Sequence, residues 1–408
     1  MKNTLHKIFT LAFFGMAFTT NAQDLNNYIE EALENNPEIQ SYRLQYEIAE
    51  EKLNEASTLG NTEFGAGYFV SEPETRTGPQ RFKLSVKQML PWFGTITARE
   101  NYASSLAESS YTEIAIAKRK LALSIAQSYY KLFALQANQK VLQEQIDLIQ
   151  NYQQLALTGV EVGKTSAVKV FQLQIRENEL EKEQKVFQQE YMAEQSVFNS
   201  LLNKNNKTIV VTENLEIPEI SDEIKRDSLT LHPELLKYDA LYNSIARAEM
   251  LNQKVGSPNL GIGVDYINVS ERTDMDVVDN GKDIFMPMVT LSIPIFNKTI
   301  QSKTVQNQLQ QEEIEAKKIA KLNELNSYLD QAVSNRTNAR IDFETQLKNL
   351  EQTKNAEEIL IRNYETERMN FDDLLDILDL QLQIQLKKIA AIKKYYTASA
   401  ILNYITNI

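Results

Sequence analysis

The chain has 408 residues and contains no cysteine, so we expect no disulfide, no thiol chemistry and no lipidated cysteine. Its 43 basic and 55 acidic residues give a net charge of −12, an acidic balance that argues against binding to nucleic acid. Two histidines and no cysteine offer no cluster for a transition metal, and we expect neither a metal nor another cofactor.

The first 22 residues have the layout of a secretory signal peptide. Lys2 and Lys7 flank the start, an apolar run follows from Ile8 to Phe18, and small residues lead to Ala22. The run has about eleven residues, too few to cross a bilayer as a helix. We expect cleavage after Ala22, and the loss of both lysines takes the net charge from −12 to −14. No later stretch approaches the length of a transmembrane helix, so none is predicted.

Three long stretches contain neither glycine nor proline and are rich in helix formers: 95–158, 164–217 and 295–408. Because these two residues punctuate most chains, such stretches predict long helices of the coiled-coil type. The first stretch has two apolar rows at heptad spacing, formed by Ile125, Leu132 and Ile146 and by Leu135, Leu142 and Ile149. A less regular row in the last stretch consists of Ile319, Leu322, Leu325, Leu329, Val333, Leu347 and Leu350. So narrow an apolar stripe on a long polar helix needs neighbouring helices on both sides.

Most of the glycines and prolines gather in two windows, Gly60–Gly94 and Gly256–Pro294, and each window predicts a hairpin of two strands. In both, apolar residues alternate with small or charged ones: Phe82, Leu84 and Val86 in the first, and Leu260, Ile262, Val264 and Tyr266 in the second. This alternation is typical of a membrane barrel, with lipid outside and water inside. A soluble antiparallel sheet with one buried face explains the alternation equally well.

The sequence repeats itself at an offset of about 196 residues. Asn36-Pro37-Glu38 corresponds to His232-Pro233-Glu234 at this offset, and later in the chain Val162-Gly163-Lys164 corresponds to Met369-Asn370-Phe371 at a somewhat larger one. Gly and Asn both tolerate the left-handed conformation that ends a helix, so each triplet of the second pair predicts a turn. Each half therefore predicts a helix, a hairpin, a long helix, a turn and a further helix. Residues 208–212, between the halves, predict a short strand.

Five short motifs occur in one order along nearly the whole mature chain: Ala32-Leu33-Glu34-Asn35-Asn36-Pro37-Glu38-Ile39, Gly65-Ala66-Gly67-Tyr68, Leu90-Pro91-Trp92-Phe93-Gly94, Val162-Gly163-Lys164 and Leu375-Asp376-Ile377-Leu378-Asp379. Through them the sequence resembles the TolC family of outer-membrane efflux proteins. The resemblance implies a mainly α-helical fold with a small β part. Each of three chains would give four strands to a twelve-stranded outer-membrane barrel, and the helices would build a periplasmic tunnel.

The expected organisation of the chain follows from the repeat and the resemblance. It comprises a signal peptide (1–22), a first periplasmic helix (23–59), a first barrel hairpin (60–94), a first helical hairpin (95–203), an equatorial linker (204–220), a second periplasmic helix (221–256), a second barrel hairpin (257–296) and a second helical hairpin (297–408). The implied partners are two further copies of the chain, a periplasmic adaptor (membrane fusion protein), an inner-membrane pump of the RND or ABC type, and the lipid of the outer membrane.

The resemblance also implies functional residues. Family members carry two aspartates at the tunnel entrance, which correspond here to Asp376 and Asp379, and their spacing places them on one helix face. Asp372 stands where the best-studied members have an arginine, and Asp373 makes the turn more acidic still. Together the four would form an acidic ring that favours cations. Solvated surface acids near a helix start would show the same spacing. The expected adaptor contacts are at Val162, Gly163, Lys164, Met369, Asn370 and Phe371, all of which are also ordinary turn residues.

The function expected from the resemblance is that of an outer-membrane efflux channel with a periplasmic helical domain. A conduit for protein secretion of type I and a soluble periplasmic coiled-coil scaffold are alternatives. An enzyme is not expected, because the sequence shows no phosphate-binding loop, nucleophile elbow or zinc motif.

Overall fold

The computed structural model describes residues 20–205, 208–212, 214–219, 226–295, 297–365 and 371–406. Within these ranges, no helix has both the length and the apolar character needed to cross a lipid bilayer. The chain divides into two compact units. We call Ser41–Ala115 with Pro233–Leu322 the sheet unit, and Met1–Gln40 with Ile116–His232 and Asn323–Ile408 the helical unit. Most of the expected signal peptide lies outside the described residues.

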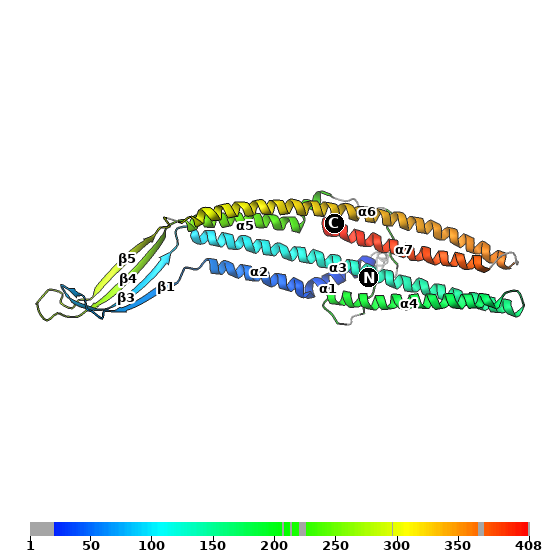
Figure 1. The fold of residues 1–408 in the computed structure, drawn as a ribbon, viewed down its shortest axis with the longest axis horizontal. Helices are drawn as coiled ribbons and strands as arrows, with labels where there is room; N and C mark the ends of the chain where they lie inside the picture. The colour runs from blue at the N-terminus through cyan, green and yellow to red at the C-terminus, as the bar shows by residue number, and fades with distance from the viewer. Residues whose placement is uncertain are drawn as a thin grey trace, which may run out of the picture. The chain divides into compact units, whose positions relative to one another are not determined.

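The sheet unit contains the described strands together with one whole helix and parts of three others (Figure 1). The strands are β1 (Thr62–Tyr68), β2 (Glu74–Thr75), β3 (Gly78–Leu90), β4 (Asn259–Val269) and β5 (Ile284–Ser292). The helices are most of α2 (Pro37–Ala56), the start of α3 (Thr95–Glu161), all of α5 (Pro233–Val255) and the start of α6 (Thr299–Glu365). The strands fall inside the two windows rich in glycine and proline.

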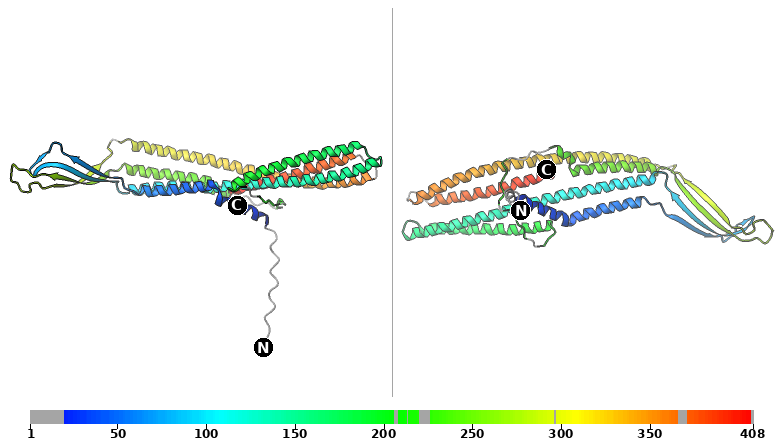
Figure 2. Two further views of the ribbon diagram at one scale, coloured as in Figure 1. Left: turned by 90° about the horizontal axis from the view of Figure 1, so that it is seen from below. Right: turned by 180° about the vertical axis from the view of Figure 1, so that it is seen from behind.

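The sheet is antiparallel throughout, with the order β1-β3-β4-β5, and the short strand β2 pairs with β3. The predicted hairpins are thus present, and they are joined to each other through β3 and β4, as the two further views in Figure 2 also show. In the described part of the chain, β1 and β5 each pair on one side only. Both edges of the sheet therefore leave backbone groups without a strand partner.

The helical unit contains α1 (Thr20–Asn35), α4 (Ala167–Leu201), the 3-10 helix η1 (Arg226–Leu231), α7 (Phe371–Thr406) and the remaining parts of α3 and α6. Helices α3 and α4 form one hairpin, and α6 and α7 form the other (Figure 1). Asn36 separates α1 from α2, and its side-chain oxygen accepts hydrogen bonds from the backbone N–H groups of Glu38, at 2.9 Å, and Ile39, at 3.4 Å. This capping explains why a new helix starts at Pro37.

The predicted apolar rows of α3 are buried. Ile125, Leu132, Leu142, Ile146 and Ile149 are each at most 4% exposed, and Leu135 is 6% exposed. The row predicted for α6 is only partly confirmed, because Leu325 and Leu329 are buried whereas Ile319 and Leu347 are 61% and 42% exposed. Within the described part of one chain, the two exposed residues have no neighbouring helix that covers them.

The strand predicted at residues 208–212 is absent, and this prediction was wrong. Tyrosine hydroxyls take the place of a strand partner. The hydroxyl of Tyr28 accepts from the N–H of Val210 at 3.1 Å, and the hydroxyl of Tyr129 accepts from the N–H of Thr212 at 3.0 Å. The Tyr191 hydroxyl donates to the carbonyl of Ile209 at 3.3 Å, and burial raises the pKa of Tyr191. Side chains on the helices thus satisfy backbone groups of residues 209–212 that a neighbouring strand would otherwise pair with.

Candidate functional site

The turn between α3 and α4 lies where the sequence places it. Gly163 has a φ of 74°, and its N–H donates to the carbonyl of Val160 at 3.0 Å. The N–H of Lys164 donates to the carbonyl of Gly159 at 2.8 Å, which completes a glycine-dependent helix end. Ser166 then caps α4 by accepting from the N–H of Val168. The corresponding Met369 and Asn370 lie outside the described residues, as does the side chain of Phe371.

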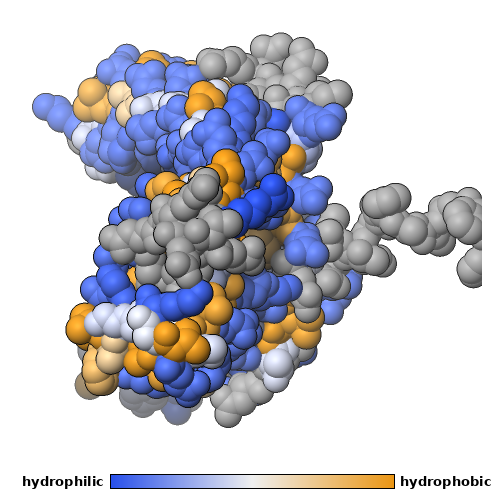
Figure 3. Space-filling model, turned by 90° about the vertical axis from the view of Figure 1, so that its right-hand side faces the viewer, coloured by the Kyte–Doolittle hydropathy of each residue, from blue (hydrophilic) through white to orange (hydrophobic). Residues whose placement is uncertain are grey.

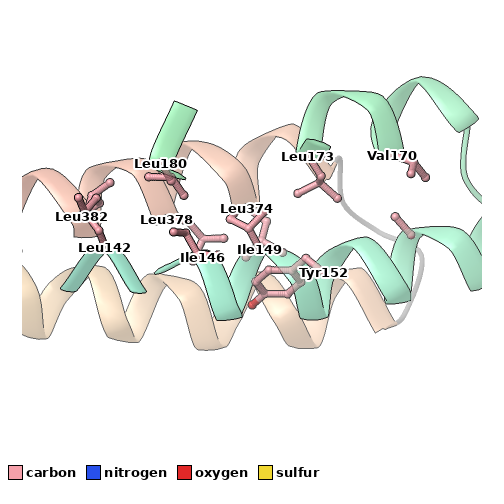
Figure 4. Packing of buried hydrophobic residues seen from close by; sticks show 11 residues of the cluster. Leu142, Ile146, Ile149, Tyr152, Val170, Leu173, Leu180, Leu374, Leu378 and Leu382 are labelled. Carbon is pink, nitrogen blue, oxygen red and sulfur yellow. The ribbon is translucent and has the colours of Figure 1, made fainter. Parts of the chain in front are cut away.

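Both hairpins contribute to one apolar cluster next to this turn (Figure 4). Its members are Leu142, Ile146, Ile149, Tyr152 and Ala156 from α3, Val170, Leu173 and Leu180 from α4, and Leu374, Leu378 and Leu382 from α7. Burial, with a smaller contribution from the charge of Glu357, raises the pKa of Tyr152 to about 12. The three leucines of α7 recur every four residues and fix which face of α7 is turned inward. The aspartates of α7 therefore lie on its other faces.

Two of the four expected ring aspartates are paired with cations from the opposite hairpin. Asp372 forms an ion pair with Lys169, and Asp379 forms one with Arg176, with 2.6 Å between the Asp379 carboxylate and the Arg176 guanidinium. Both acids are seven residues apart on α7, and both bases are seven residues apart on α4. The equal spacing lets two successive heptads of α4 and α7 match. Lys169 and Arg176 were not anticipated from the sequence, although this shared spacing is visible in it.

Asp373 and Asp376 differ from the other two. Both are exposed, and neither forms an ion pair or a hydrogen bond with another residue of the described chain. Asp372 and Asp373 lie in the first turn of α7, where the partial positive charge of the helix end favours them. Within one chain, Asp372 and Asp379 are thus paired with basic side chains of α4, whereas Asp373 and Asp376 face solvent. Seen toward the end of the hairpins, the surface is mainly hydrophilic, with hydrophobic residues in separate patches (Figure 3).

One face of the sheet, which we call the apolar face, is hydrophobic and exposed. Its central row follows the strand register and consists of Phe64, Val86, Val264 and Pro287. Phe64 is 79% exposed, and Val86 and Val264 are 42% and 43% exposed. A soluble sheet would bury such a face. The exposure therefore favours the membrane interpretation of the alternating pattern.

The opposite face, which we call the polar face, carries the small and charged residues. Lys83, Ser85 and Lys87 project from β3, and Gly263 and Asp265 lie on β4. Asp265 is completely buried and forms an ion pair with Lys83. The sheet thus separates an apolar surface from a hydrated one, which is the division that a strand at a lipid boundary requires.

Aromatic residues lie near both ends of the sheet. At one end the rings of Phe82 and Tyr266 are 6.1 Å apart, and those of Tyr266 and Phe285 are 5.3 Å apart. Directly after β3, at the other end, Trp92 and Phe93 lie 5.8 Å apart, and Phe93 is 82% exposed. Aromatic side chains at both ends of a membrane-spanning sheet are typical, because they lie at the two interfaces between lipid and water.

Among the residues that the structure describes, no group of three or more His, Cys, Asp or Glu side chains is placed to hold a metal ion.

The fold is shared with solved outer-membrane channels. The structure of CusC superimposes with a TM-score of 0.79 over 97% of this chain and 95% of that one, at 13% sequence identity. CmeC of Campylobacter jejuni gives 0.73 over 99% of this chain and 93% of that one, at 15% identity. VceC of Vibrio cholerae gives 0.73 over 95% and 96% of the two chains, at 16% identity. These likenesses establish a TolC-like fold, mainly helical with a small sheet.

A search of curated protein sequences found no match. The model of the family described as "Outer membrane efflux protein" matches residues 28–201, which include the first sheet hairpin and the hairpin of α3 and α4. That family consists of channel proteins rather than enzymes. The family match and the shared fold confirm the resemblance drawn from the short motifs: residues 28–201 are similar to outer membrane efflux proteins, and the chain has a TolC-like fold.

Proposed function

We propose that three copies of this chain form an outer-membrane channel of a tripartite efflux system, which passes small molecules or metal ions to the cell exterior. The observation that carries the proposal is the exposed apolar face of a sheet with two unpaired edges. In lipid, every backbone polar group needs a partner, so such a sheet is stable only when it closes into a barrel. Four strands cannot close, whereas three chains supply twelve.

The helical unit also has exposed apolar surfaces that a neighbouring copy of the chain could cover. On α4, Val168, Phe171 and Ile175 share one helix face and are 60% to 63% exposed. On α6, Ile341 and Ile359 are 56% and 60% exposed, and five helical turns separate them. The two stripes lie on different helices and are not copies of each other. Contact between unlike surfaces of neighbouring copies supports a closed ring rather than a symmetric dimer.

We assign the hairpins of residues 60–94 and 257–296 to the barrel, the long helices to a periplasmic tunnel, and residues 204–220 to a linker around the helices. The ends of the helical hairpins would form the tunnel entrance. Val162 is 62% exposed there and supports contact with a periplasmic adaptor through Val162-Gly163-Lys164 and Met369-Asn370-Phe371. The adaptor would connect the channel to an inner-membrane pump of the RND or ABC type.

At the entrance, Asp373 and Asp376 of three copies would supply six solvated carboxylates that attract cations. The ion pairs of Asp372 with Lys169 and of Asp379 with Arg176 would join the two hairpins of one chain and hold the entrance narrow. In this role they would replace the arginine that the best-studied members of the family carry at the position of Asp372.

The assembly is tested by membrane fractionation and by channel recording. An outer-membrane channel is recovered with outer-membrane lipid as a detergent-resistant trimer and conducts ions in a planar bilayer. Recovery as a soluble periplasmic protein would support the coiled-coil scaffold instead. Deletion of the gene separates the remaining alternatives, because loss of efflux sensitises the cell to drugs or metals, whereas loss of type I secretion abolishes export of a protein.

The filter is tested by neutralising its exposed acids. Asp373→Asn with Asp376→Asn should weaken the block of single-channel current by multivalent cations. Glu358→Gln is the matched control, because Glu358 is an exposed acid on α6 that pairs with Arg362 of the same helix. Unchanged block in the aspartate variant would remove Asp373 and Asp376 from the entrance.

A further inference from the structure

A cavity of about 410 Å³ lies in the helical unit and is lined by residues of α1, α3 and α7, by Pro218 and by Arg336 of α6. Its described lining residues all belong to this one unit of one chain. Pockets that bind small molecules usually enclose about 300–1,000 Å³. Cleavage after Ala22 would leave the lining complete, because its first residue along the chain is Leu25. The cavity is therefore large enough for a small organic molecule.

This cavity is basic, although the chain as a whole has a net charge of −12. Among the described residues that line it, two are arginines, Arg119 and Arg336, and none is an aspartate or a glutamate. Arg119 is half-buried and forms no ion pair within the described chain. Its guanidinium donates to the carbonyl oxygen of Tyr404 at 3.4 Å. A guanidinium has five N–H donors in a fork that matches a carboxylate, so Arg119 retains donors for an anion.

Burial gives Arg119 a reason to bind an anion. It lowers the pKa of the guanidinium, because the protein around it replaces water that would stabilise the positive charge. A negative group in the cavity would restore part of that stabilisation, and it would meet no acidic side chain among the described lining residues.

Tyrosine side chains give the same cavity an aromatic wall. The rings of Tyr130 and Tyr396 are stacked with their centroids 5.1 Å apart, and the Tyr395 ring meets Tyr396 edge-on at 5.5 Å. Burial raises the pKa of Tyr130, so its hydroxyl stays protonated at neutral pH and can donate to a negative group. Aliphatic side chains complete the lining, among them Leu25, Ile29, Leu123 and Leu402.

From the charge and the wall together we propose that the cavity binds an amphipathic organic anion, with its carboxylate or sulfonate at Arg119 and its apolar body against the tyrosines. An inorganic anion would leave the aromatic and aliphatic wall unused. A neutral molecule would leave the Arg119 guanidinium without a counter-charge. A flat, ring-containing body fits the wall best, because aromatic rings stack on one another. The site goes beyond the proposed channel function and does not depend on it, since one chain supplies the whole lining.

The test is a titration of the purified mature protein in lipid nanodiscs with anilinonaphthalene sulfonate, an amphipathic anion whose fluorescence rises when it leaves water for an apolar site. Phenylnaphthylamine has the same rings without the sulfonate and is the neutral comparison. Empty nanodiscs give the signal that is due to lipid alone. We expect saturable binding of the sulfonate dye at one site per chain, with higher affinity than that of the neutral dye. Equal affinities of the two dyes would overturn the proposed anion site.

Two variants locate the binding. Arg119→Gln should weaken the sulfonate dye by at least about tenfold and leave the neutral dye unchanged, because a hydrogen bond to a charged group is lost. Lys118→Gln is the matched control, since it removes one positive charge from a neighbouring residue of α3 that does not line the cavity. Ala122→Phe fills the cavity with both arginines in place and should abolish binding of both dyes, so the site stays testable even if Arg119→Gln fails to fold.

The proposal is overturned if Arg119→Gln binds the sulfonate dye as tightly as Lys118→Gln, if saturable binding survives Ala122→Phe, or if the unaltered protein shows no saturable binding. Failure of the proposed function would be seen separately, as a protein that forms no channel in a planar bilayer but still binds the dye.

Discussion

Reversal of one cross-hairpin charge should open the channel, and the structure sets the size of the effect. The side chains of Arg176 and Asp379 are 29% and 49% exposed, so their ion pair contributes about 0.2–1 kcal/mol, as is usual for partly exposed pairs. Arg176→Glu replaces this attraction by a repulsion of similar size, a change of about 0.4–2 kcal/mol per chain. Three chains acting together would shift the opening equilibrium by about 1–6 kcal/mol, which is at least roughly fivefold.

The assay is the open probability of single channels in a planar bilayer. We expect Arg176→Glu to raise it strongly and the exchange of Arg176→Glu with Asp379→Arg to restore the closed state. Lys182→Glu is the matched control, because the ion pair of Lys182 with Glu179 lies within α4 and does not connect the two hairpins. The reasoning is refuted if the reversed variant opens no more often than the control, or if the exchanged pair stays as open as the single reversal.

Three further predictions concern the helical unit. Leu378→Ala empties a fully buried site of the apolar cluster and should cost about 2–5 kcal/mol, seen as a lower temperature of trimer dissociation, whereas Leu380→Ala at a 47% exposed site should change it little. The raised pKa of Tyr152 means that its stabilising contribution is complete below pH 10 and is lost as the pH rises through about 12; Tyr152→Phe should therefore flatten the alkaline loss of helical circular dichroism, and an unchanged pH profile would contradict this. Tyr129→Phe removes the hydroxyl that accepts from the buried N–H of Thr212, at a cost of about 1–3 kcal/mol. We therefore expect faster proteolysis at the linker. Cleavage as slow as in the unaltered protein would show that this hydrogen bond does not hold the linker in place.

Local pattern was enough to predict the strands and the heptads of α3. Alternation in residues 82–86 and 260–266 defines two faces, and the rows of Ile125 and Leu135 repeat at the coiled-coil period, so neither needs knowledge of distant contacts. The glycine turn at Gly163 is equally local. Each of these features depends on residues within one or two turns or one hairpin.

Features that depend on partners distant in sequence were missed. The linker strand failed because Tyr28 and Tyr129 satisfy backbone groups that a propensity argument assigns to a neighbouring strand. Ile319 and Leu347 belong to an apolar row, but a single chain leaves them exposed. The four aspartates were expected to form one acidic set. In the structure, Asp372 and Asp379 are instead paired with Lys169 and Arg176, which lie at the same heptad spacing on α4.

The central claim, that three chains close one barrel through unlike edges, is tested most directly by disulfide trapping. The chain contains no cysteine, so one introduced on β1, at Glu63, Gly65 or Gly67, and one on β5, at Met286 or Met288, report only on each other. Oxidation in intact outer membranes should link β1 of each copy to β5 of the next and give covalent dimers and trimers but nothing larger. Absence of cross-links at every combination, or a ladder that continues beyond the trimer, would contradict a closed ring of three chains.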